Sequence, residues 1–205
     1  MANTTFSGPV RSLNGFETVS KNATTGAITV TSGAKMATEA AGGAGIEGTA
    51  AVYVTQVERF KSDTDTNVNI VKTTIMIDLT GLSSTAADDI IGKADSGVAY
   101  IGRVTAANQG VVFGVKMECF ETPAGGDPDI DLYSATEGTG VENGAIGDLT
   151  ETIIINGGDA AAGTRTAGGT IVADQYLYLV SGDATNAVYT AGRLLITILG
   201  YDVAS

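Results

Sequence analysis

The feature of this sequence that most constrains its fold is a succession of short apolar runs separated by glycine, asparagine, aspartate and threonine, with 28 glycines among 205 residues. From Val71 to Leu79 apolar and polar residues alternate, which places every second side chain on one face of an extended strand. Residues 111–120 repeat this alternation, so we expect Val111 and Phe113 on the same buried face as Cys119. The pattern predicts an all-β domain.

The rest of the chain can be divided in the same way. A serine at its start and Gly92 after its end make Ser84–Ile91 the one segment that resembles a helix. The last two strands are expected to form a hairpin. We therefore predict a single antiparallel β-sandwich over residues 27–205, with a jelly roll as one form of it. The further strands are expected at residues 27–31, 51–60, 98–105, 149–156, 170–180 and 188–201.

Residues 1–26 differ from this pattern, because their apolar residues are isolated between polar ones. Three basic residues and one acidic residue give residues 1–35 a net charge of 3 − 1 = +2, in a chain that is acidic as a whole. We expect an extended N-terminal arm that lies on a partner, although a frayed terminus has the same composition. The residues expected to make contact are Phe6, Val10, Arg11, Leu13, Phe16 and Val19.

Composition excludes several classes of function. The chain has no histidine, no tryptophan and one cysteine, which rules out histidine triads, intramolecular disulfides and Cys/His zinc sites. Eleven basic against 23 acidic residues give a net charge of −12, so neither nucleic acid nor an anionic membrane is an expected partner. No spaced motif places a nucleophile beside a base, and we predict that the protein is not an enzyme.

Three further features are candidate sites. Gly43–Gly48 has the spacing G-x-G-x-x-G, but it precedes a predicted strand, where a dinucleotide-binding loop must follow one. Asp127, Asp129 and Asp131 alternate and could supply oxygen ligands to calcium, although the positions of an EF-hand are not matched. Ten acidic residues and no basic one lie between Lys116 and Arg165, which favours a solvated acidic loop instead. The candidate surface rings are Tyr100, Tyr133 and Tyr189.

The strand near the C-terminus is apolar on both faces, as a central strand or a subunit contact would be. One face carries Leu194, Ile196 and Ile198. The other face, which we expect to make the subunit contact, carries Leu195, Thr197, Leu199 and Tyr201.

Four segments, TTFSGPVRSLNGF, DDIIGKADSGVAYIGRVT, ECFETPAGGDPDIDLYSATEGTG and QYLYLV with YTAGRLLITILGYD, resemble structural proteins of marine tailed bacteriophages. Among these the chain is most similar to capsid decoration (cement) proteins. The resemblance implies a protein made in the bacterial cytoplasm that binds the outside of the head, contacts the major capsid protein and forms a homotrimer.

Two alternatives remain within the virion and its surroundings. A major capsid protein is disfavoured because the shell tile of tailed phages has a long spine helix, for which no segment has the periodicity. A head or tail fibre module that binds a host receptor or glycan is the other alternative. Fibre shafts usually contain repeats, and the sequence has no convincing period.

Overall fold

The computed structural model divides the chain into two compact units, Met1–Ala37 and Thr38–Ser205. The side chains described are those of residues 42–46, 70–184 and 187–201. The backbone is described for residues 17–21, 28–33, 42–46, 53–61, 68–184 and 187–203.

The first unit contains an antiparallel hairpin. Strands β1 (Glu17–Lys21) and β2 (Ile28–Gly33) pair with each other, and Val19 lies opposite Val30. The division after Ala37 differs from the predicted arm boundary at residue 26, since the strand expected at residues 27–31 is β2 and belongs to this unit. The other five residues predicted to make contact, Phe6, Val10, Arg11, Leu13 and Phe16, lie outside the described residues. The anchoring arm therefore stays a prediction.

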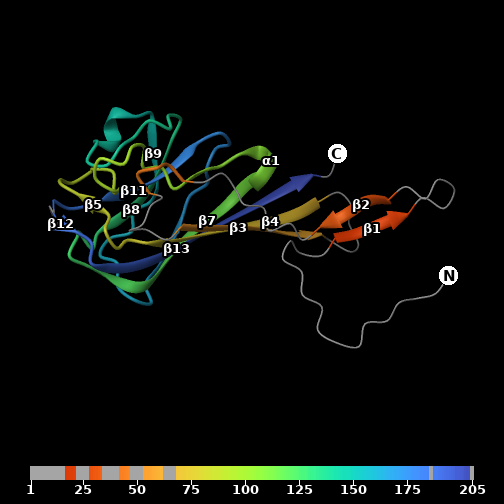
Figure 1. Ribbon diagram of the computed structural model, residues 1–205, viewed down its shortest axis with the longest axis horizontal. Helices are drawn as coiled ribbons and strands as arrows, with labels where there is room; N and C mark the ends of the chain where they lie inside the picture. The colour runs from red at the N-terminus through yellow and green to blue at the C-terminus, as the bar shows by residue number, and fades with distance from the viewer. Residues whose placement is uncertain are drawn as a thin grey trace. The chain divides into compact units, whose positions relative to one another are not determined.

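The second unit is an antiparallel β-sandwich, which confirms the predicted fold class (Figure 1). The five-stranded sheet has the order β10 (Arg165–Gly168), β7 (Val111–Ala124), β13 (Ala191–Val203), β4 (Val68–Asp78), β3 (Tyr53–Lys61). The four-stranded sheet has the order β6 (Gly102–Arg103), β11 (Tyr176–Ser181), β8 (Ile130–Ala135), β9 (Glu151–Ile155). A small third sheet pairs β12 (Ala187–Val188) with β5 (Ser83–Ser84). Jelly-roll connectivity stays a prediction.

The core lies between the two larger sheets and follows the alternation of the sequence. In β4 the residues Val71, Ile75 and Ile77 are buried, as predicted. They are paired through eleven residues with β13, whose Leu194, Ile196 and Ile198 are also buried. Burying one face of each strand on the same apolar layer is what joins the sheets into a sandwich.

Strand β7 departs from the expected alternation. Val111 and Phe113, predicted to be buried, are 57% and 50% exposed, whereas Val112 points inward. The cause is a register shift, because Leu199 pairs with Gly114 and the next residue of β13 pairs with Val112, which leaves Phe113 as an extra residue. Such a bulge turns the following side chains to the other face of the strand. Cys119 lies beyond the bulge and is buried, as predicted.

The predicted helix over Ser84–Ile91 is wrong. After β5 this segment makes a turn with Asp88 at a positive φ of 63°, and Ile90 then forms a bridge with Val180 of β11. Ile90 and Ile91 are both buried, which an extended chain achieves by pointing successive side chains to opposite sides. The helices among the described residues are α1 (Ala106–Gln109) and the 3-10 turn η1 (Ile146–Asp148).

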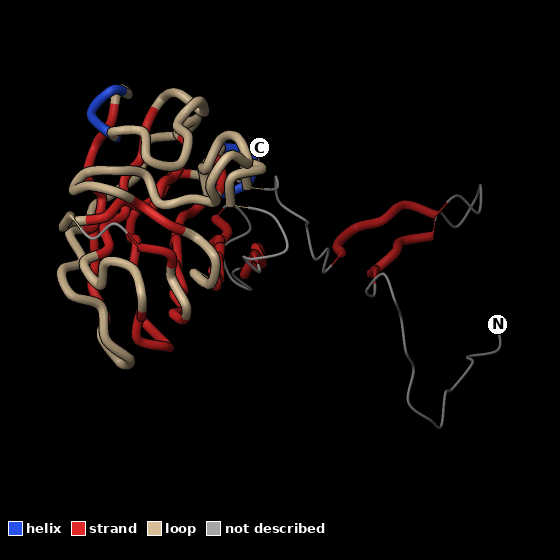
Figure 2. The backbone as a smooth tube through the Cα atoms, turned by 60° about the vertical axis from the view of Figure 1, so that its left-hand side comes forward, coloured by secondary structure: helices blue, strands red, loops and turns tan. Residues whose placement is uncertain are grey.

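The predicted hairpin of the last two long strands is also wrong, because β11 belongs to the four-stranded sheet and β13 to the five-stranded one. Strand β11 is buried on both faces, and the loop that contains Glu137 and Gly140 packs on it. Figure 2 draws the loops of this unit in tan. Tyr178 of β11 donates a hydrogen bond to the Glu137 carbonyl at 2.7 Å and accepts one from the Gly140 amide at 3.2 Å. Burial raises the pKa of Tyr178 to about 12, so this buried hydroxyl stays protonated.

Candidate interaction surface

The two sheets differ in what lies outside them. The loop that contains Glu137 and Gly140 covers Tyr178 of β11, whereas the five-stranded sheet exposes large apolar side chains on the face that points away from the core. The predicted subunit-contact residues Leu195, Thr197, Leu199 and Tyr201 lie along this face of β13. They pair in register with outward residues of β4, namely Met76, Thr74, Lys72 and Ile70 respectively. We call this surface the outer face.

The outer face has more exposed apolar side chains than the sequence pattern suggests. The rings of Phe113 and Tyr201 lie 6.4 Å apart between their centroids. Phe120, which follows the buried Cys119, sits at a second register shift of β7 and is also exposed. Six of the ten large apolar side chains that are exposed among the described residues belong to this sheet: Ile70, Met76, Val111, Phe113, Phe120 and Tyr201. Such a concentration is typical of a contact surface.

Ion pairs neutralise the charges of the outer face. The Glu118 carboxylate is held at 2.8 Å by both the Lys116 ammonium and the Arg165 guanidinium. It is only 8% exposed, so these two cations satisfy a carboxylate that is already largely desolvated.

A second group of ion pairs surrounds Arg193 of β13. Its Nε lies 3.3 Å from Asp78 and 3.5 Å from Glu121, on the strands that flank β13. Burial acts to raise the pKa of Asp78, but hydrogen bonds from Thr80 and Arg193 outweigh burial, and the pKa is lowered. Asp78 is therefore held in its charged form beside Arg193.

The acidic segment is not the solvated loop that its composition suggests. Asp131 belongs to β8, a central strand of the four-stranded sheet that the sequence analysis missed. Asp127 is fully buried, and its two carboxylate oxygens accept hydrogen bonds from the amides of Asp129 and Asp183 at 3.0 and 2.6 Å. Asp131 accepts from the Gly157 amide at 2.8 Å. These carboxylates organise turns of the backbone.

The predicted calcium ligands lie near one another but are not arranged as a metal site. Among the described residues, no group of three acidic, cysteine or histidine side chains has an arrangement that could hold a metal ion. Asp129 differs from its neighbours because its buried Oδ1 has no hydrogen-bond partner. Burial, and then the charges of Asp131, Asp127, Asp183 and Asp159, raise its pKa.

The glycines of the G-x-G-x-x-G segment have a structural role. Gly43 and Gly45 donate backbone hydrogen bonds to the carbonyls of Tyr100 and Val98, at 2.8 and 2.7 Å. A Cβ at Gly43 would fall against the Val98 carbonyl oxygen. The motif therefore lets two backbone segments approach closely, and Ile46 beside it is buried in the core.

The candidate surface rings are less exposed than expected. Tyr189 is buried, and its hydroxyl donates to the Asp127 carbonyl at 2.7 Å; burial, and then the charge of Asp127, raise its pKa. Tyr100 and Tyr133 are half-buried and pack against the core. Tyr100 meets Tyr176 edge to face at 4.9 Å. These rings stabilise the fold instead of forming a flat sugar platform.

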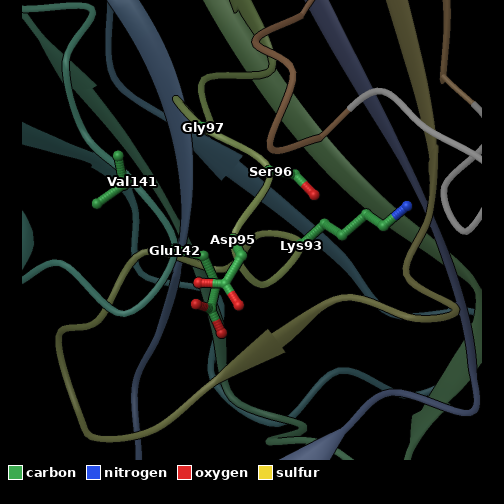
Figure 3. Close-up of a pocket in the computed structure, with 6 residues that line it drawn as sticks. All are labelled: Lys93, Asp95, Ser96, Gly97, Val141 and Glu142. Atoms are coloured by element: carbon green, nitrogen blue, oxygen red, sulfur yellow. The ribbon is translucent and has the colours of Figure 1, made fainter.

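A polar hollow of about 330 Å³ lies between two loops (Figure 3). The Lys93 side chain extends away from the carboxylates of Asp95 and Glu142 (Figure 3). The Ser83 hydroxyl donates to Glu142 at 2.6 Å, and the Ser96 hydroxyl donates to a carbonyl of its own turn at 3.1 Å. We assign no chemistry to the hollow. Its lining residues are Lys93, Asp95, Ser96, Gly97, Val141 and Glu142.

Comparison with known proteins leaves the outer face as the main guide to function. No family model, no curated protein and no solved structure matches the chain. In the part of the chain that the structure describes, no helix has the length and apolar character needed to cross a membrane.

Proposed function

We propose that this protein is a non-enzymatic decoration protein that binds the outer surface of a bacteriophage head and stabilises contacts between copies of the major capsid protein. The observation that carries the proposal is the outer face. A sandwich with one apolar and ion-paired sheet face is suited to a broad contact between the subunits of such a protein. The head as location and the capsid protein as partner come from the resemblance of the sequence segments quoted above.

The proposal assigns different tasks to the two units. The segment before the sandwich anchors the protein by inserting its separated apolar residues into shallow pockets of the shell. The sandwich supplies a compact body and takes part in contacts between subunits of a homo-oligomer, for which the resemblance implies a trimer. Nucleic acid and membrane are not partners, in keeping with the net charge of −12.

The two alternatives have less support. The described residues contain no long helix, which a capsid tile of the tailed-phage type needs as its spine. For a glycan-binding fibre module, the rings predicted to contact a sugar, Tyr100, Tyr133 and Tyr189, pack into or against the core.

The anchoring role can be tested in the full chain by replacing Phe6, Val10, Leu13 and Phe16 with serine. We expect the protein concentration that half-fills the sites on expanded phage heads to rise roughly tenfold or more for this variant. The reason is that serine buries much less apolar surface in the pockets of the shell. A matched control replaces the exposed Val141 and Val172 with serine and should bind like the parent. Unchanged binding of the arm variant would refute the anchor. Failure of the parent protein to bind heads would refute the decoration role itself.

A further inference from the structure

We infer that the outer face binds the same face of a second copy of this chain, which gives a two-fold dimer of face-to-face sheets. The contact would centre on Leu195 and its neighbour Met76, which are paired in register in the middle of the sheet. Phe113 and Tyr201 would contribute from one end of the face and Phe120 from the other.

The size of the face fits such a dimer. Strands β4 and β13 are paired over eleven residues, which corresponds to a length of about 36 Å. The four longer strands β7, β13, β4 and β3 lie side by side over a width of about 19 Å, so the face measures roughly 700 Å². A stable interface buries about 800 Å² per partner. Nearly the whole face would therefore be used.

Charge favours a second copy as the occupant. The described side chains of the outer face carry 4 − 3 = +1, whereas the whole chain carries −12, so the rest of the chain carries −13. Two copies that met through other, acidic surfaces would bring carboxylates together. Contact through the outer face avoids this repulsion. The charged residues of the outer face are the basic Lys72, Lys116, Arg165 and Arg193 and the acidic Asp78, Glu118 and Glu121.

The internal ion pairs make the face suitable for burial. Glu118 already has two cationic partners within its own chain, and Arg193 lies between Asp78 and Glu121. Packing two such faces together therefore encloses charges that are paired beforehand, and the penalty of a buried unpaired charge is avoided. The apolar side chains between them supply the favourable free energy.

Pairing through the sheet edge is a less suitable way to form a dimer. Strand β3 is an edge strand, and its sequence contains Glu58, Arg59 and Lys61. Charged residues on an edge strand are a common means of preventing strand addition. Face-to-face packing instead uses the apolar part of the same sheet.

The inference rests on the homo-oligomer part of the proposed function, replaces the trimer implied by the resemblance with a dimer, and can fail separately from the decoration role. Head binding is measured with capsids, whereas the dimer is measured with the purified protein alone. A dimer without head binding would leave the interface standing and refute the decoration role. Head binding by a protein that stays monomeric would support the decoration role and refute the dimer interface.

The test is sedimentation velocity over a range of concentrations with Met76→Glu, which places a carboxylate at the centre of the face in each copy. Met76 is 39% exposed, so the monomer should keep its fold, which thermal unfolding can check. We expect the dimer dissociation constant to rise roughly tenfold or more, since two like charges would meet. Val172→Glu is the matched control, because it adds the same charge at a 68% exposed position away from the sheet. It should dimerise like the parent.

Phe120→Ser is a second variant that changes no charge and removes one exposed ring. It should weaken the dimer as well, which would separate the loss of apolar packing from general repulsion. Dimerisation by the parent and by Val172→Glu, with weakening in both face variants, supports the inference. A parent that is monomeric at all concentrations, a trimer, or equal behaviour of Met76→Glu and Val172→Glu would overturn it.

Discussion

At the scale of single residues, Asp129 combines two unfavourable features. Its Oδ1 is buried without a hydrogen-bond partner, and four other aspartates act on it with like charge. Burial is the larger of the causes that raise its pKa. A carboxyl whose pKa is higher in the folded state stabilises that state at low pH, and this contribution is lost as the pH rises through the folded pKa. At neutral pH the ionised group therefore weakens the fold.

We expect Asp129→Asn to stabilise the protein at pH 7 by about 1 kcal/mol, which corresponds to a rise in Tm of about 2–4 °C. The gain should shrink as the pH falls toward the ordinary range of an aspartate, where the parent Asp129 is itself protonated. Thermal unfolding at several pH values measures this. Asp148→Asn removes the same charge from an exposed position with no such environment and should change Tm little. A gain that is independent of pH would contradict the explanation.

At the scale of elements, the sequence predicted best where one strand face meets one apolar layer. The alternation in β4 was sufficient, because each inward residue meets the core. Strand β8 was missed because Asp131 and the two aspartates before the strand suggested solvent. Backbone amides far along the chain satisfy two of these carboxylates, Gly157 that of Asp131 and Asp183 that of Asp127. Ser84–Ile91 has helix caps, but its Ile90 is used in a bridge to β11. These outcomes depend on tertiary partners that a local pattern does not contain.

The outer face, too, was predicted only in part from the local sequence pattern. The residues Leu195, Thr197, Leu199 and Tyr201 were predicted as one face of a strand, and the structure places them on one face. Phe113 was not predicted to join them, because it lies at a register shift of β7, whereas Phe120 was predicted on the face opposite Cys119 and is exposed. A bulge depends on the neighbouring strand and breaks the period of two on which the prediction relied.

The close approach of residues 42–46 to the backbone near Val98 is a further contact between elements. Gly43→Ala should lower the free energy of unfolding by about 1–3 kcal/mol, because its methyl group would push against the Val98 carbonyl oxygen. Chemical denaturation measures the loss. Gly147→Ala is the control, since nothing lies within 4 Å of a Cβ at Gly147. If both variants have the same stability as the parent, the close approach does not account for Gly43.

At the scale of the whole molecule, charge is distributed unevenly, with a nearly neutral outer face and −13 on the rest of the chain. Two copies must therefore approach against a repulsion between their remaining surfaces, even though their contact face is favourable. Salt screens this repulsion, because the Debye length falls from about 30 Å at 0.01 M to about 3 Å at 1 M ionic strength.

We expect the dimer of the parent protein to become tighter as sodium chloride is added, which sedimentation velocity measures as a falling dissociation constant. The Met76→Glu variant should respond in the same direction but remain weaker than the parent at each concentration of salt, since it lacks the apolar centre of the contact. A dimer that loosens with salt would mean that attraction between opposite charges holds it together, and the outer face would then be the wrong surface.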